Sequence, residues 1–294
     1  MRRMLIDGMP LWLIGGVFLL CMIIIGLQNP HLPKLWVYPL SRDLIETYEV
    51  SKLGSLHVQE SSHFIIRYRE EDAQMVPMIT AAAEQAYEPV TTSLGYSPAR
   101  KSTVVVMSSR REMQKSLGWS AEQSAMGVYW AGMIQVLSPR AWLRGDSLVD
   151  QTDDFIRNGP LAHEFTHLVV DAKARGNYPR WFTEGIAQYQ EYRLNGYEWI
   201  TASNTLTREL YTISDLEKNF DDLPNQSLAY RESFAAVRYI YENYGDTSIR
   251  EILDELNRGK AMPGALKDVL GMDYPQYEEA WQQWAYINML HPLQ

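Results

Sequence analysis

Cysteine is nearly absent from this chain: Cys21 is the single one among 294 residues. A disulfide within the chain is therefore excluded, and so is a metal site built from several thiolates. Leu20 precedes Cys21 where a lipoprotein signal needs a small residue, so acylation is not expected and the thiol acts as a small apolar side chain. The stability of the fold must come from its core, helped by any bound metal.

Basic residues are also scarce, with 27 lysines and arginines against 36 acidic residues and a net charge of −9. Leaving out Arg2, Arg3 and Asp7, the rest of the chain has 25 basic and 35 acidic residues, a net charge of −10. Internal repeats and low-complexity tracts are absent as well. This charge balance argues against nucleic acid as a partner and against docking on anionic lipid.

One long stretch lacks charge altogether, the eighteen residues from Pro10 to Leu27. A bilayer is spanned by about 20 apolar residues, so this run is long enough for a transmembrane helix. Arg2 and Arg3 precede it, which places the N-terminus in the cytoplasm and the remainder outside it. The sequence thus predicts a single-pass protein of the cell membrane with an extracytoplasmic domain. A cleaved signal peptide and a buried core helix are the alternatives, although no A-x-A-like cleavage site follows.

The chain divides into a predicted anchor (1–28), a juxtamembrane stalk (29–55) and a domain (56–294). Pro30, Pro33 and Pro39 make residues 28–40 a poor helix, so we expect a semi-rigid segment whose Trp36 and Tyr38 rest at the membrane interface. Within the domain, residues 56–157 have an α/β pattern and residues 158–294 a helical one. The predicted fold class is therefore α+β, with a mixed sheet and helices followed by a mainly helical half.

Periodicity gives the elements of the domain. Strands are predicted at 56–59, 63–68, 103–107, 125–129 and 133–137, the last two joined by a turn at Ala131-Gly132. Helices are predicted at 72–94, 111–117, 180–194, 214–220, 227–244, 247–258, 264–270 and 275–290, besides the one described next. Residues 146–157 are acidic and are predicted to form a mobile approach to the next helix. A solvated loop is the favoured reading of Asp150, Asp153 and Asp154, and a partner of a metal-bound histidine among them is the alternative.

The helix predicted after Gly159-Pro160 carries the string His163-Glu164-Phe165-Thr166-His167. Residues four apart on a helix project from the same face, so His163 and His167 can bind one metal ion. Glu164, on the same turn, can take the proton of a water on that metal without being a ligand. The alternative, two histidines that pack or cap and a solvated glutamate, does not explain the apolar continuation Leu168-Val169-Val170.

The next helix supplies a third candidate ligand in Trp181-Phe182-Thr183-Glu184-Gly185. Antiparallel packing of the two helices would bring Glu184 level with the histidines and complete the His₂Glu set of a catalytic zinc site. Gly185 beside it removes a side chain where the backbone must come close. The alternative for Glu184 is an exposed helical glutamate.

These two motifs, HEFTH and WFTEG, resemble the gluzincin zinc metallopeptidases, in particular the peptidase MA-like family. The resemblance extends over about residues 63–245. It implies a thermolysin-like core with the zinc site between its two halves, one Zn²⁺ held by His163, His167 and Glu184, and Glu164 as general base. Metzincins need glycine and histidine where this chain has Val170 and Lys173. The G-x-M-E-N signature of zinc aminopeptidases is missing upstream.

The resemblance also implies two further parts of the site. The last strand before the motif would pair with an extended substrate backbone, a role that falls on Gly127, Val128, Tyr129 and Trp130, or else on residues 134–137. The alternative is an ordinary strand shielded by a loop. Leu228-Ala229-Tyr230-Arg231-Glu232-Ser233 is similar to the A-Y-x-x-S start of the helix that supplies an oxyanion donor. Tyr230 is the candidate, its alternative being a half-buried core tyrosine.

The sequence thus predicts a membrane-anchored zinc metalloendopeptidase acting on peptide or protein substrates near the membrane, with the lipid bilayer as its second partner. Two other functions stay open. One is a non-catalytic, membrane-tethered binding or scaffold protein of the same fold, and the other is a zinc hydrolase of a non-peptide bond.

Overall fold

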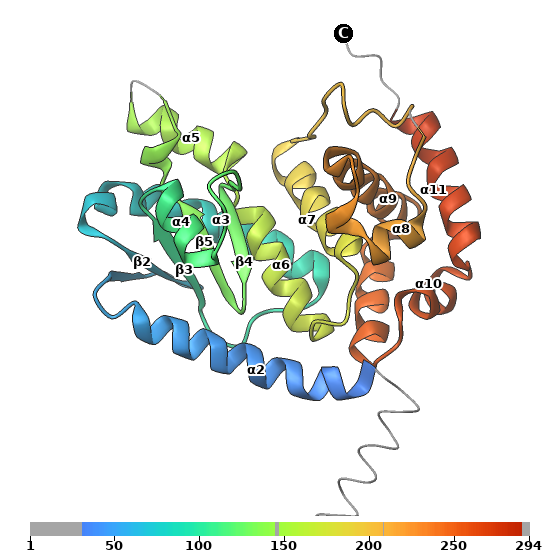
Figure 1. The fold of residues 1–294 in the computed structure, drawn as a ribbon, viewed down its shortest axis with the longest axis horizontal. Coiled ribbons are helices and arrows are strands. Elements are labelled where there is room, and N and C mark those ends of the chain that lie inside the picture. Colours follow the sequence, from blue (N-terminus) through green and yellow to red (C-terminus); the bar gives the residue numbers. More distant parts are fainter. Residues whose placement is uncertain (1–30, 145–146, 208, 290–294) are drawn as a thin grey trace, which may run out of the picture.

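The computed structural model describes residues 31–144, 147–207 and 209–289 (Figure 1). Within these ranges, no helix combines the length and the apolar character that a membrane crossing needs. The predicted transmembrane run, residues 10–27, lies outside them. The sheet has five strands in the order β1-β2-β3-β5-β4. They are β1 (His57–Glu60), β2 (Phe64–Tyr68), β3 (Ser102–Met107), β4 (Gly127–Trp130) and β5 (Met133–Leu137), where the sequence predicts strands.

Three central strands are parallel and the two edge strands antiparallel to them, so the sheet is mixed as predicted. β4 and β5 form a hairpin, with Trp130 opposite Met133. Its turn has positive φ at both Ala131 (48°) and Gly132 (90°), which suits a two-residue hairpin loop. β5 lies between β3 and β4 and is buried along its whole length. It has no free edge, so the alternative placement of substrate on residues 134–137 is wrong.

Helices cover both faces of the sheet. On one face lie α3 (Val76–Leu94), which continues the 3₁₀ turn η1 (Glu70–Met75), and α6 (Leu161–Ala174). Apolar side chains of the three central strands meet Ile79 of α3 and Phe165 of α6 in the main core. On the other face, Met113 of α4 (Arg110–Leu117) and the C-terminal end of α2 (His31–Lys52) cover a smaller cluster around Val105.

The segment expected to be a loop, residues 146–157, is largely helical. α5 spans Leu148–Asn158 and follows the 3₁₀ turn η2 (Pro139–Ala141). The Ser147 side chain caps α5 by accepting a hydrogen bond from the backbone N–H of Asp150, and Phe155 anchors the helix in the core. The Ser147 cap and the buried Phe155 stabilise the helix, although its acidic composition had indicated a loop.

The prolines of the predicted stalk also fail to prevent a helix, since residues 31–52 form α2 (Figure 1). Pro33 lies in the first turn, where the backbone N–H has no partner to lose. Pro39 removes one hydrogen bond from the interior of the helix. Tyr38 and Arg42 offset this cost by contacts with the body of the protein that are described below.

The C-terminal half is helical, as predicted, and contains α7 (Arg180–Asn195), α8 (Ile213–Lys218), η3 (Phe220–Asp222), α9 (Gln226–Asn257), α10 (Met262–Leu270) and α11 (Tyr274–Asn288). Non-helical φ and ψ at Gly245 kink α9 where the sequence predicts a break. α7 packs closely on α9 at Gly185, where a β-carbon would lie 2.2 Å from the carbonyl oxygen of Ser233. A mixed sheet with helices followed by a helical half confirms the predicted α+β architecture.

Candidate metal centre and active site

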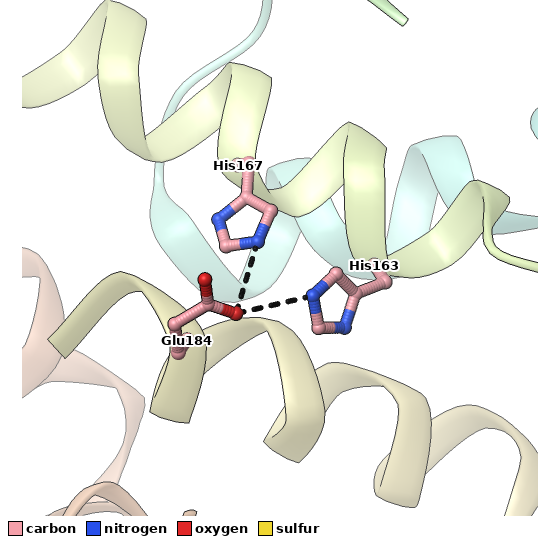
Figure 2. A group of neighbouring side chains, drawn as sticks. All are labelled: His163, His167 and Glu184. Atoms are coloured by element: carbon pink, nitrogen blue, oxygen red, sulfur yellow. Dashed lines mark ion pairs between the residues drawn. The ribbon is translucent and has the colours of Figure 1, made fainter. Parts of the chain in front are cut away.

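The HEFTH string lies on α6 and the WFTEG string on α7, and the two helices pack side by side (Figure 2). His163 and His167 project from one face of α6 toward α7, as their spacing requires. The Nε2 atoms of both histidines lie 3.4 Å from the same oxygen, Oε2 of Glu184. One ligand atom from each of the three residues lies within 4.8 Å of the others. The structure therefore brings together the three residues that the sequence predicted as ligands.

Partners on α7 occupy the other nitrogen of each imidazole. The Nδ1 atom of His163 is 2.9 Å from Oε2 of Glu191, and the Nδ1 atom of His167 is 2.7 Å from Oγ1 of Thr183. Because a carboxylate accepts a hydrogen bond, Glu191 favours the neutral tautomer of His163 that has its proton on Nδ1, and in that tautomer the lone pair on Nε2 can bind a metal. Two such imidazoles and one carboxylate oxygen fit the donor set of a tetrahedral zinc site with one open position.

Charge and burial both act on the pKa values of this cluster. Burial alone would raise the pKa of Glu184, but the charges and hydrogen bonds of His167 and His163 lower it well below its usual range. Burial opposes protonation of His163, yet the neighbouring Glu191 and Glu184 raise its pKa well above its usual value. Glu184 is therefore an anion, the state in which a carboxylate binds a cation.

Glu164 lies beside the cluster but outside it. Its Oε2 accepts a hydrogen bond of 2.6 Å from the backbone N–H of Tyr129 on β4. Burial raises the pKa of Glu164. The charges of His163 and His167 oppose this shift, and the negative charge of Glu184 adds to it. A buried carboxylate with a raised pKa is a stronger base than a solvated one, which is the property a general base needs.

β4 meets the start of α6 at Gly127. A β-carbon at this position would lie 2.6 Å from Cβ of Pro160 and 2.8 Å from Cγ of Glu164, so only glycine allows this approach. The Leu137 N–H bonds to the Met126 carbonyl, and in an antiparallel ladder such pairs alternate. The backbone groups of Gly127 and Tyr129 therefore point away from β5, and those of Val128 and Trp130 point toward it. Gly127 and Tyr129 form the free edge beside Glu164.

Arg180 connects Tyr230 of α9 to the candidate ligand Glu184 by hydrogen bonds. The Arg180 guanidinium donates one hydrogen bond to Oε1 of Glu184 (3.2 Å) and another to the Tyr230 hydroxyl (3.0 Å), and it pairs with Asp221. Glu184 thus keeps Oε2 for the histidines and a metal. Burial, followed by the charge of Glu184, raises the pKa of Tyr230, so its hydroxyl keeps a proton that it can donate.

A cavity of about 180 Å³ opens next to His163. Its apolar wall consists of aromatic rings from two segments: Tyr197 and Trp199 after α7, and Tyr230 and Phe234 of α9. Glu198 also lines it but is paired with Arg238 at 2.8 Å and Arg231 at 3.4 Å. Because these arginines neutralise Glu198, the cavity favours an apolar or aromatic side chain over a basic one.

Asp171 is a partner of the site that sequence reasoning missed. It is fully buried on α6, one turn beyond His167. Its carboxylate accepts hydrogen bonds from the hydroxyls of Tyr38 (2.6 Å), Tyr129 (2.7 Å) and Tyr178 (2.9 Å), and it pairs with Arg42 at 3.3 Å. Through Tyr129, whose N–H holds Glu164, this hub connects α2 to the edge strand and the candidate base. The four-residue step from His167 to Asp171 was a signal available in the sequence.

The acidic residues suggested as partners of the histidines do not serve that purpose. Asp150, Asp153 and Asp154 are all exposed on α5. Asp150 instead bonds to its own cap, Ser147. The positions next to the imidazoles belong to Glu191 and Thr183, and the seven-residue step from Glu184 to Glu191 was the local signal for the first of these.

Comparison with known proteins supports the class that the motifs indicate. The family model for the Peptidase MA superfamily matches residues 148–287, a range that includes both motifs and Tyr230. The match includes the segments that carry HEFTH and WFTEG, and it confirms the resemblance drawn from them. The match supports a function of the metallopeptidase type.

Among solved structures, the chain is similar to one described as the crystal structure of Legionella pneumophila aminopeptidase A in complex with aspartic acid. The identity is 12% and the TM-score 0.47, with 78% of this chain and 28% of that chain covered. The chain thus spans less than a third of the length of that enzyme. A comparison with curated proteins finds no match.

Proposed function

We propose that this protein is a membrane-anchored zinc metalloendopeptidase of the gluzincin type, with a thermolysin-like core. One observation carries the proposal: the Nε2 atoms of His163 and His167 converge on Oε2 of Glu184 at 3.4 Å each, with a partner on both Nδ1 atoms. The eighteen uncharged residues 10–27 support an anchor that leaves the catalytic domain outside the cytoplasm.

The three ligands would hold one zinc ion, which would polarise the scissile carbonyl and lower the pKa of an attacking water toward about 7. Glu164 takes one proton from that water as its oxygen bonds to the carbonyl carbon, and passes it to the amine nitrogen as the C–N bond breaks. Held by the N–H of Tyr129, its carboxylate needs no reorientation for this step.

Tyr230 would donate a hydrogen bond to the oxyanion that develops on the former carbonyl oxygen. Its hydroxyl accepts from Arg180 and therefore keeps its own proton for this purpose. An extended substrate would lie along the edge of β4, where the backbone groups of Gly127 and the carbonyl of Tyr129 point away from β5, the N–H of Tyr129 being bonded to Glu164. A substrate side chain next to the scissile bond would enter the aromatic cavity beside His163.

The test is the variant Glu164→Gln beside Glu88→Gln, which changes an exposed glutamate of α3. General base catalysis is worth about 10² to 10⁴ in rate, so Glu164→Gln should lose at least that factor in kcat while its zinc content and melting temperature stay near wild type. Glu88→Gln should retain full activity toward the same peptides. Unchanged peptide hydrolysis in Glu164→Gln would contradict the mechanism, and a zinc-loaded wild type that cleaves esters but no peptide would favour a different hydrolase.

A further inference from the structure

The outward face of α2 has an unusual composition for a helix at the surface of a protein. Trp36, Val37, Leu40, Leu44 and Tyr48, called here the outer row, are between 41% and 72% exposed. Their spacing places them within about 120° of one another around the helix, since successive residues turn by about 100°. α2 thus presents one continuous apolar stripe to its surroundings.

Tyr38, Arg42 and Glu46 of α2 lie on the opposite side, against the protein, while the uncharged hydroxyl residues Thr47 and Ser51 are exposed. Tyr38 and Arg42 bond to the buried Asp171. Glu46 pairs with Arg100 at 2.7 Å. Asp43, the charged residue nearest the outer row, pairs with Arg42 and Arg100. Between Trp36 and Tyr48 the exposed side is thus mainly apolar and the charged residues Arg42, Asp43 and Glu46 are paired, the reverse of the usual arrangement in an amphipathic surface helix.

Two close contacts fix this orientation of α2. A β-carbon at Gly176 would lie 2.7 Å from the ring of Tyr38, and one at Gly132 would lie 2.7 Å from Oε2 of Glu46. Both glycines have positive φ, at 71° and 90°. α2 therefore packs closely against two separate segments, the backbone after α6 and the β4–β5 turn. Rotating the helix to bury the outer row would break contacts with both.

We infer that the outer row is a membrane-docking surface, which lies in the interface of the bilayer that holds the anchor. The uncharged run 10–27 ends a few residues before α2 begins, so the chain delivers this helix to the bilayer surface. Trp36 and Tyr48 lie toward the two ends of the row, and such amphipathic rings favour the headgroup level. The outer row itself has no charged residue, and the neighbouring Asp43 is paired with Arg42 and Arg100, so the row fits the uncharged interface of a phosphatidylcholine bilayer rather than an anionic surface.

This docking would orient the catalytic domain as well as tether it. α2 lies along one side of the molecule, and its inward residues bond to Asp171 on α6 (Figure 1). His167 is one helical turn from Asp171, about 6 Å along the helix axis. The candidate metal centre is thereby held at a fixed and short distance from the bilayer, which suits substrate segments that emerge from or lie on the same membrane.

The inference rests on the proposed anchor, and the experiment separates the two. Cys21→Ser removes the only cysteine, so one new cysteine can carry an environment-sensitive fluorophore. The label is placed at Leu44 (72% exposed) or Val37 of the outer row, and for control at Ile287 (77% exposed) near the end of α11. In Figure 1, α2 runs along the bottom and α11 ends near the top. The full chain is reconstituted in phosphatidylcholine vesicles, with and without nitroxide-bearing lipid.

Flotation with the vesicles tests the anchor, and quenching tests the outer row. We expect the labels at positions 37 and 44 to emit at shorter wavelength and to lose most of their intensity to the nitroxide lipid, while iodide in the water quenches them little. The Ile287 label should show the opposite pattern. A floating chain whose outer-row labels respond like Ile287 would overturn the inference and leave the anchor intact.

Two other outcomes would also overturn the docking surface. Labels protected from both quenchers would mean that protein, such as a second copy of the chain, covers the outer row. A chain that fails to float would refute the anchor and the docking surface together.

Discussion

The contact between α7 and α9 at Gly185 gives a quantitative test of how the site is held. In Gly185→Ala the new β-carbon would lie 2.2 Å from the backbone oxygen of Ser233 and 2.5 Å from Cγ2 of Val237. Non-bonded carbon contacts favour about 3.5–4.0 Å, so α7 must move away from α9 by roughly 1 Å. The neighbouring residue on α7 is the candidate ligand Glu184.

The displacement should affect stability and metal binding together. Overpacking typically costs about 1–3 kcal/mol, and the clash with backbone puts Gly185→Ala at the upper end. The higher helix propensity of alanine returns about 1 kcal/mol, so the net loss should be about 2 kcal/mol. Metal–ligand distances tolerate only about 0.2 Å, and we expect zinc affinity to fall by at least about tenfold.

The assays are urea unfolding of the metal-free protein and zinc titration against a competing chelator. Gly264→Ala is the matched control, because within the described residues a β-carbon there meets no atom within 4 Å. This variant of α10 should gain about 0.5–1 kcal/mol and bind zinc like wild type. If Gly185→Ala also kept wild-type stability and zinc affinity, the reasoning about the α7–α9 contact would be refuted.

Two further predictions concern hydrogen bonds and pH. Tyr129→Phe and Tyr178→Phe each remove one bond to Asp171, which should cost about 1.5–3 kcal/mol in unfolding free energy. Tyr129→Phe keeps the backbone N–H that holds Glu164 but loses the hydroxyl that fixes this part of β4 to Asp171, so kcat should fall by about tenfold in this variant alone. Equal kcat values in the two variants would count against the hub as a positioning device. Burial raises the pKa of Glu232 to about 8, so the folded chain keeps a proton that the unfolded chain loses above about 4.3, and stability falls as pH rises between these values. Glu232→Gln should match wild type near pH 4 and exceed it by about 3–5 kcal/mol at pH 9, and parallel pH curves would disprove this.

The part of the site that sequence predicts well is the part encoded by local spacing. A four-residue step on one helix aligns His163 with His167, and a short connection between two apolar helices brings Glu184 opposite them. The turn at Ala131-Gly132 could be predicted for the same reason, since its conformation depends on two adjacent residues.

What the sequence did not reveal depends on distant residues. Asp171 is joined to Tyr38 across 133 positions, and no periodicity indicates such a contact. The contact between Tyr38 and Asp171 also explains why residues 28–40 were wrongly predicted to be a poor helix. The prediction used the local proline content, which carries no information about a stabilising partner elsewhere in the chain. Periodicity also could not decide which strand of the β4–β5 hairpin lies at the edge, since that depends on the pairing of β5 with β3.

The central claim is that His163, His167 and Glu184 hold a zinc ion. The most direct measurement is elemental analysis of the purified full chain beside His163→Ala and, as a matched control, His57→Ala, which changes an exposed histidine of β1. The account expects one zinc per chain in wild type and in His57→Ala, and none in His163→Ala. A folded wild-type protein without zinc, or zinc that persists in His163→Ala, would contradict it.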